Sequence, residues 1–422
     1  MKLPVIFAAA LCVVAPAHAD PTPWVPTDSK LLGIHAAAAN GDIAEIKKIL
    51  AKKPSVVNKL DADKDTPLYM AIIAGQNEAV AVLLNAGADP NIAGHDGDMP
   101  LHVAVRNWDV EEASLLLDHG AKVDAYNRQG NTPLILSMKP GMEEMAKLFI
   151  GSGAKVDLPA RNEQGVLVVP LGEAVMHKNG EPIAKLLLDK GADVNAAPWM
   201  HVTPLMYAVC DDKQQIVQML LDHGAKLDRL NDMGQSVLDV AIRFGTAKTV
   251  NYLLDHGMSV NMQSPQTTPL IVAVDSGSME MVNLLIKRGA DVNEKATNGD
   301  TPLYLAAQEN RLEVANVLFL QGVKVNETCS NHCSPLIVAV LRNNADMVRL
   351  LLSKGADSSL ADSGGETPLY VACVQRNADI VRMLLDGGAD PNLAPNGETP
   401  LHMAHHVGDG KIASLLKSHG AK

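Results

Sequence analysis

The sequence predicts an all-α solenoid, a linear stack of about twelve helix-turn-helix repeats with short β-hairpin fingers between them. A regular period is the main observation, because Thr-Pro-Leu or a close variant occurs eleven times, with steps of 33, 33, 37, 34, 33, 32, 33, 33, 33 and 32 residues. Composition is the second, because aromatic residues are only 3% of a chain that is 47% hydrophobic, which suits thin, closely stacked helices. The copies begin at Thr66, Met99, Thr132, Val169, Thr203, Ser236, Thr268, Thr301, Ser334, Thr367 and Thr399.

The tripeptide predicts the start of the first helix of each repeat. Thr is a good N-cap, and Pro fits the first turn, where its missing amide hydrogen is not needed. The Ala-rich segment that follows, as in 303–307, lets the helices of neighbouring repeats approach closely.

A second apolar segment predicts the second helix of each repeat. Its paired leucines supply buried area, worth roughly 1.5–3 kcal/mol per fully buried side chain. A Gly then ends the helix in the left-handed conformation, and an Asp/Asn-rich stretch turns the chain into the finger, as at 191–195 and 289–293.

These motifs closely resemble those of the ankyrin repeat family. The family's Thr-Pro-Leu-His start is nearly whole at 100–104 and at 399–404, and a diverged first copy begins near Leu32. The resemblance covers residues 31–422. It implies that the fingers and the exposed side of the first helices line a concave face that binds proteins.

Residues 155–245 are the least regular part of the array. The step of 37 places extra residues in the finger at 159–168, one more lies near 177–180, and Val237 stands where Pro is usual. We expect a bend or a specialised surface here. Polar residues at core positions, His405 and Lys417, predict a solubilising cap at the last repeat.

The N-terminus has the pattern of an export signal. Lys2 precedes an apolar run at 3–14, and residues 17–19 form a small-x-small cleavage site. We therefore expect a signal peptide at 1–19, a Pro-rich leader at 20–30 and a periplasmic or secreted mature protein. The run is too short to span a bilayer, so membrane insertion is not expected.

Charge and motifs exclude several function classes. The formal net charge of −12 lacks the basic footprint that nucleic acid binding needs. No phosphate loop, nucleophile elbow or His-Glu-x-x-His motif occurs, so we expect no enzyme activity and no cofactor. His402 and His406 have i, i+4 spacing but lack further ligands, so no metal site is predicted.

Two cysteines, Cys329 and Cys333, lie in the finger before the tenth repeat. In an oxidising compartment a pair four residues apart in a tight turn can form a disulfide. Two free thiols, or a redox or metal role with His332, remain as alternatives. The spacing differs from the Cys-x-x-Cys of thiol oxidoreductases.

Partner-binding residues are predicted from the resemblance at one exposed position of the first helix and in the finger at 199–201. Exposed Trp and Met are typical of binding hot spots, although Trp199 could instead cover the junction between the fifth and sixth repeats. The predicted binding residues are Ile73, Arg106, Lys139, Met176, Trp199, Met200, His201, Arg243, Leu341 and Val374.

The leading hypothesis is a monomeric, non-enzymatic scaffold that binds a partner protein through a rigid concave face. A secreted effector that binds a host protein is one alternative. A periplasmic accessory protein in redox or oxidative-stress defence, using the Cys pair, is another.

Overall fold

The computed structural model describes residues 33–394 and 397–422. The signal peptide and leader predicted at 1–19 and 20–30 lie outside these residues. The chain divides into two compact units, Met1–Asp232 and Met233–Lys422. Among the described residues, no helix is long and apolar enough to cross a membrane.

The first unit consists of helix pairs, one short 3-10 helix (η1) and one hairpin. Its elements are α2 (Ile34–Ala39), α3 (Ile43–Lys52), η1 (Pro54–Val56), α4 (Pro67–Ile73), α5 (Asn77–Asn85), α6 (Pro100–Arg106), α7 (Val110–Asp118), α8 (Pro133–Leu136), α9 (Glu143–Gly151), β1 (Ala160–Arg161), β2 (Leu167–Val168), α10 (Pro170–Met176), α11 (Glu181–Asp189), α12 (Pro204–Cys210) and α13 (Gln214–Asp222).

The second unit consists of helix pairs throughout its described residues. Its elements are α14 (Val237–Phe244), α15 (Ala247–Asp255), α16 (Pro269–Ser276), α17 (Met279–Lys287), α18 (Pro302–Gln308), α19 (Leu312–Leu320), α20 (Pro335–Leu341), α21 (Ala345–Ser353), α22 (Pro368–Val374), α23 (Ala378–Asp386), α24 (Pro400–His406) and α25 (Gly410–Ser418).

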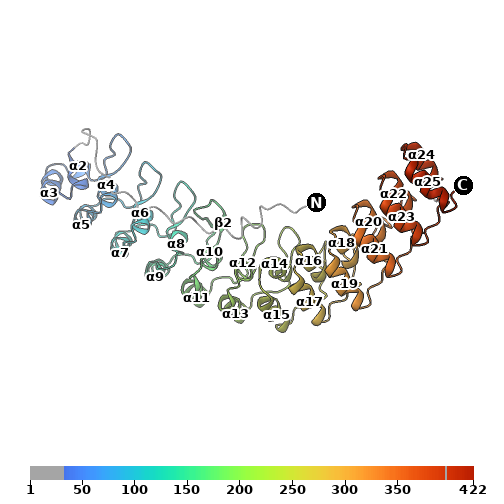
Figure 1. The fold of residues 1–422 in the computed structure, drawn as a ribbon. Helices are drawn as coiled ribbons and strands as arrows, with labels where there is room; N and C mark the ends of the chain where they lie inside the picture. Colours follow the sequence, from blue (N-terminus) through green and yellow to red (C-terminus); the bar gives the residue numbers. More distant parts are fainter. Residues whose placement is uncertain (1–32, 395–396) are drawn as a thin grey trace. The chain divides into compact units, whose positions relative to one another are not determined.

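Within each unit the helices form two rows (Figure 1). The first helices of successive repeats form one row, with the fingers projecting beyond it, and the second helices form the other. Each first helix buries the Leu of its tripeptide, for example Leu68 and Leu303, both 0% exposed. This apolar layer continues from repeat to repeat, as the all-α solenoid prediction requires.

Side-chain caps start the first helices as predicted. Thr66 Oγ1, for example, accepts a hydrogen bond of 3.0 Å from the Tyr69 amide, and eight other Thr or Ser N-caps do the same. Helix α14 begins at Val237 instead of Pro, and here Ser236 and Asp239 form a reciprocal capping box. The lost Pro is thereby offset by a second cap hydrogen bond.

Most fingers are closed by turns and not by strands. Among the described residues, regular strands occur only in the finger that the sequence marked as enlarged, where β1 pairs antiparallel with β2. Four fingers are also tied by an Asp or Asn whose Oδ1 accepts from the amides two and four residues later. These four residues are Asp61, Asn127, Asn162 and Asp362.

Asn side chains in the segments that follow the second helices form hydrogen bonds between neighbouring repeats. Asn91, for example, donates from Nδ2 to the Gly120 carbonyl at 3.0 Å and accepts from the Lys122 amide at 2.8 Å. At two junctions of the first unit an Asp takes this place: Asp124 accepts from the Lys155 amide and Asp157 from the Asp193 amide. The same double contact as at Asn91 is made by Asn58, Asn195, Asn261 and Asn392.

Candidate protein-binding surface

In each unit, we call the surface formed by the fingers and the last turn of the first helices the finger face. We call the exposed first-helix position at which binding residues are predicted the stripe position. It lies seven positions after the N-cap residue, at or near the C-terminus of each first helix. Equivalent positions recur in every repeat because the backbone repeats. The side chains at these positions therefore decide what the face can bind.

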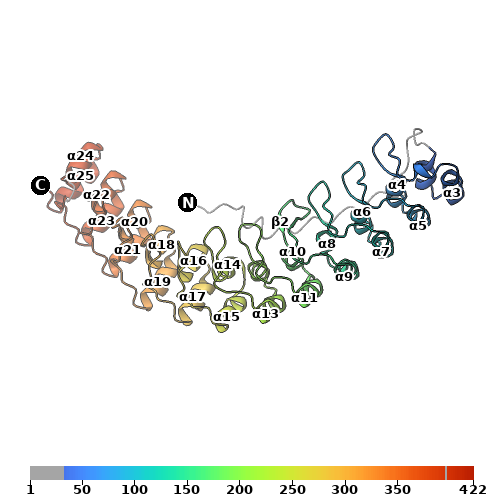
Figure 2. The ribbon, with the colours of Figure 1, turned by 180° about the vertical axis from the view of Figure 1, so that it is seen from behind.

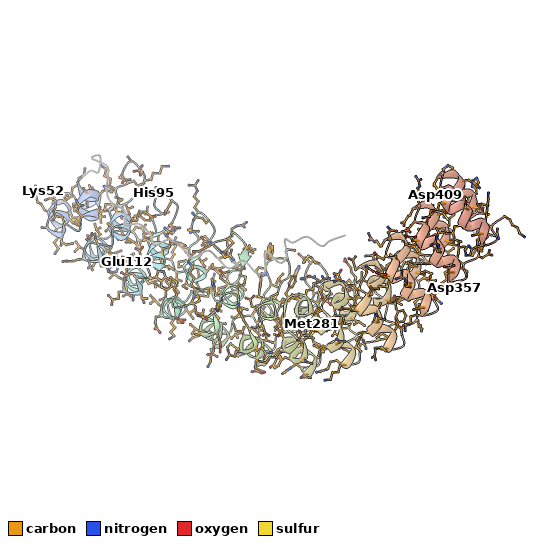
Figure 3. The ribbon with its side chains drawn as sticks, viewed as in Figure 1. Lys52, His95, Glu112, Met281, Asp357 and Asp409 are labelled. Atoms are coloured by element: carbon orange, nitrogen blue, oxygen red, sulfur yellow. The ribbon has the colours of Figure 1, made fainter. Side chains whose placement is uncertain are left out.

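In the first unit, Arg106 is held by acidic side chains of its own finger. Its guanidinium pairs with Asp96 at 3.1 Å and with the fully buried Asp98. Tyr69 donates its hydroxyl to Asp96 at 2.5 Å, and burial raises the pKa of this phenol, so it stays protonated and keeps donating. Figure 3 labels His95 of this finger, which pairs with Asp65 at 2.9 Å.

Lys139 and Arg243 are also engaged within their own units. Lys139 pairs with Glu163 at 2.7 Å in the first unit, and Arg243 pairs with Asp275 at 2.8 Å in the second. The three predicted cations of the stripe therefore have carboxylate partners already. A ligand that uses them must share or displace these partners.

Met176 and Trp199 are both partly buried. Met176 packs against the small apolar cluster of Ile135, Ala160 and Val168. The enlarged finger, which supplies Ala160 and Val168, therefore contacts the stripe at Met176. Its role is at least partly packing.

The finger at 199–201 has an unusual backbone. Met200 and His201 both have positive φ, 49° and 52°. Two contacts hold this conformation, since the Asp232 amide donates to the Met200 carbonyl at 3.0 Å and His201 Nδ1 pairs with the Asp232 carboxylate. Because His201 is exposed while Trp199 is only partly so, the finger presents its imidazole more openly than its indole.

Three predicted residues are apolar and lie at helix ends. Ile73 is partly buried at the end of α4, whereas Leu341 and Val374 are 45% and 44% exposed. The last two lie in successive repeats of the second unit. They form the most open apolar pair of the predicted stripe.

The predicted disulfide is not formed. Cys329 and Cys333 are both buried free thiols. The turn does bring their backbones together, with the Cys329 amide donating to the Cys333 carbonyl at 3.1 Å, but Cys333 Sγ is directed to the Ser334 carbonyl at 3.8 Å. Burial and the neighbouring Cys329 raise the pKa of Cys333 to about 12, so this thiol is protonated at neutral pH.

Several histidines contact backbone carbonyls within the repeats. His102 Nε2 contacts the Asn131 carbonyl of the next finger at 3.1 Å, and burial lowers the pKa of this imidazole to about 4. His119 and three histidines at equivalent positions contact the carbonyl four residues earlier. Among the described residues, no group of three or more His, Cys, Asp or Glu side chains is arranged to hold a metal ion.

One cavity of about 400 Å³ lies at the turns between the two helices of repeats four to six. Its lining includes Glu143, Lys178 and Lys213. The Lys213 ammonium already donates to the Val175 and Met176 carbonyls, at 2.7 and 2.9 Å. Sequence reasoning did not predict the cavity, although the extra residue near 177–180 marked this turn as irregular.

Comparisons with known proteins agree with the repeat architecture. The family model described as "Ankyrin repeats (3 copies)" matches residues 20–94, 87–160, 171–264, 261–329, 317–394 and 336–422. The human "DNA-binding protein RFXANK" is 41% identical over 68 residues, which are 16% of this chain and 26% of that protein. The chain thus matches about a quarter of that relative's length.

Proposed function

Because the chain belongs to the ankyrin-repeat family, we propose that it is a non-enzymatic, monomeric scaffold that binds a partner protein through its finger face. The observation that carries this proposal is the contrast between the residues that build the repeats, which we call the frame, and the residues at the stripe positions. Caps, buried leucines and left-handed glycines repeat almost unchanged, whereas the stripe includes Arg106, Met176 and Leu341. A frame that is already ordered loses little conformational entropy when it binds.

A DNA-binding role receives little support. The relative that is named for DNA binding shares only 68 residues with this chain, and the formal net charge here is −12. Phosphate recognition needs clustered Lys or Arg, and the cations of the stripe are paired with carboxylates. A protein surface is therefore the better candidate ligand.

We further propose that residues 1–19 direct export and that the mature chain begins at Asp20. The support is the sequence alone, a basic residue followed by an apolar run and a small-x-small site. N-terminal sequencing of the mature protein tests this. A start at Met1 in protein recovered from the producing cell would contradict export. Recovery from culture supernatant would favour the secreted effector over a periplasmic scaffold.

The redox alternative has weaker support than the scaffold. Reactive cysteines are usually exposed and have a lowered pKa, whereas Cys333 is buried and its pKa is raised to about 12. The cavity at the interhelix turns does not favour an enzyme either, since the Lys213 ammonium beside it is bonded to backbone carbonyls.

Cross-linking of the tagged full chain in native extract, followed by identification of the cross-linked residues, tests the scaffold proposal. We expect partner cross-links to concentrate on the finger face. The control variant is Leu320→Ser, which changes a side chain that is 82% exposed at the end of the second helix α19. Its cross-links to the partner should match those of the unmodified chain. Cross-links confined to the row of second helices would refute binding through the finger face.

A further inference from the structure

The second unit has an apolar pair on its finger face. Leu341 ends α20 and Val374 ends α22, and Gln375 Nε2 donates to the Leu341 carbonyl at 2.8 Å, so the two helix ends abut. These helices are neighbours in the row of first helices (Figure 2). Leu341 and Val374 keep 45% and 44% of their surface exposed. A partner side chain could therefore bury area on both at once.

The side chains one helical turn before this pair also form an apolar layer. One turn earlier on the same helices lie Ile337, 0% exposed, and Tyr370, 7% exposed. Tyr370 donates its hydroxyl to Glu398 Oε2 at 2.8 Å, while the residue as a whole stays buried in this apolar layer. The pair thus continues a packed apolar layer, and is not two isolated surface residues.

Carboxylates lie in the fingers that precede these first helices. The residue before the capping Thr is Asp300, Glu366 or Glu398 in three of the last four repeats, and Asp362 lies in the same finger as Glu366. The stripe positions of these repeats hold no Lys or Arg: they are Gln308, Leu341, Val374 and His406.

Two Arg side chains follow these helix ends in the sequence. Arg342 is exposed in the turn after α20, and Arg376, in the turn after α22, pairs with Asp409 at 3.7 Å. In the first unit, by contrast, Arg106 and Lys139 neutralise the acidic residues of the fingers. The stripe positions around the apolar pair of the second unit thus hold no Lys or Arg, whereas the fingers that precede these helices carry carboxylates.

We propose that this surface binds a basic amphipathic segment of the partner protein. Aliphatic side chains of the segment pack on Leu341 and Val374, and its Lys or Arg side chains face Glu366 and Glu398. The apolar contact provides binding free energy, and the carboxylates select against acidic segments. This inference rests on the proposed scaffold function and specifies the chemistry of the partner.

Three labelled helical 18-residue peptides test the proposal by fluorescence anisotropy with the full chain. One has a Leu face flanked by Lys, the second has Glu in place of Lys, and the third has Ser in place of Leu. We expect the Leu/Lys peptide to bind about tenfold or more tightly than either of the others. Equal binding of the Leu/Glu peptide would overturn the charge argument, and equal binding of the Ser/Lys peptide would overturn the apolar one.

Matched variants locate the site. Leu341→Ser with Val374→Ser should weaken binding of the Leu/Lys peptide about tenfold, because the side chains that provide the apolar contact are lost. Leu320→Ser, an equally apolar change off the finger face, should leave the affinity unchanged. Glu366→Gln with Glu398→Gln should weaken binding and reduce its dependence on salt. Circular dichroism checks that each variant is folded, and unchanged affinity in the folded double Ser variant would overturn the proposal.

The outcomes separate this inference from the function it rests on. If cross-links to a natural partner fall on the finger face of the first unit, and the double Ser variant binds that partner normally, the scaffold function stands and this site is wrong. If partner cross-links are absent from the finger face of both units, the scaffold proposal itself fails.

Discussion

Replacing Glu112 by Gln should stabilise the protein, and increasingly so as the pH rises. Glu112, labelled in Figure 3, lies in the first turn of α7. It is only 3% exposed, and its Oε1 is buried and unpaired. Equivalent positions hold apolar side chains such as Met145 and Ile183, also buried. Desolvation is the main cause that raises the pKa of Glu112 from 4.5 to about 8, and the charge of Asp109 adds to it.

The size of the effect follows from linkage between protonation and folding. Below pH 4.5 the carboxyl is protonated in both the folded and the unfolded chain, so its full contribution to stability is present. As the pH rises towards 8 the unfolded chain ionises first, and stability is lost. Between pH 5 and pH 7 the loss amounts to about 2–3 kcal/mol.

Urea unfolding at several pH values, followed by circular dichroism, measures this effect. Glu112→Gln removes the titration, so its stability relative to the natural chain should increase from pH 5 to pH 7. Glu111→Gln is the matched control, since Glu111 is exposed on the same helix and the substitution leaves Glu112 in place, so stability should still fall between pH 5 and pH 7. Parallel profiles for Glu112→Gln and the natural chain would refute the burial argument.

Three further predictions concern single repeats and the thiols. Thr301→Ala removes the cap of the Tyr304 amide at 3.1 Å and should cost about 1 kcal/mol in urea unfolding; no change would mean that the cap contributes nothing measurable. His102 has its pKa lowered from 6.5 to about 4, so stability should fall by up to about 3 kcal/mol as the pH drops through this range. His102→Gln should flatten that acid limb, and an unaltered limb would contradict the assignment. In a Cys12→Ser chain, the four described cysteines should react with a thiol reagent only after unfolding, because all are buried; rapid reaction in the native state would contradict their burial.

The frame was predictable because its signals are local. A Thr before a Pro caps a helix wherever it occurs, and a Gly after paired leucines ends one, so spacing alone predicted the helices of each repeat. The extra residues at 159–168 likewise predicted where a finger would be enlarged, and β1 and β2 lie there.

The candidate surface was less predictable because it depends on contacts between segments. Nothing in the sequence indicates that Arg106 has an ion-pair partner, but the folded finger places the carboxylates of Asp96 and Asp98 against its guanidinium. The spacing of Cys329 and Cys333 allowed a disulfide, yet rotation of the Cys333 side chain towards Ser334 leaves the pair unbridged. Side-chain direction is not encoded in spacing.

The amide bridges between repeats also determine where the first unit is easiest to separate. An Asn can donate and accept across a junction, whereas a carboxylate can only accept, and carboxylates occupy this place at Asp124 and Asp157. In a linear array each repeat depends only on its neighbours, so a weaker junction opens without disturbing distant ones. These two junctions flank the fourth repeat, which precedes the enlarged finger. The part of the first unit that carries the extra finger residues is thus also a part in which each of these bridges is a single hydrogen bond.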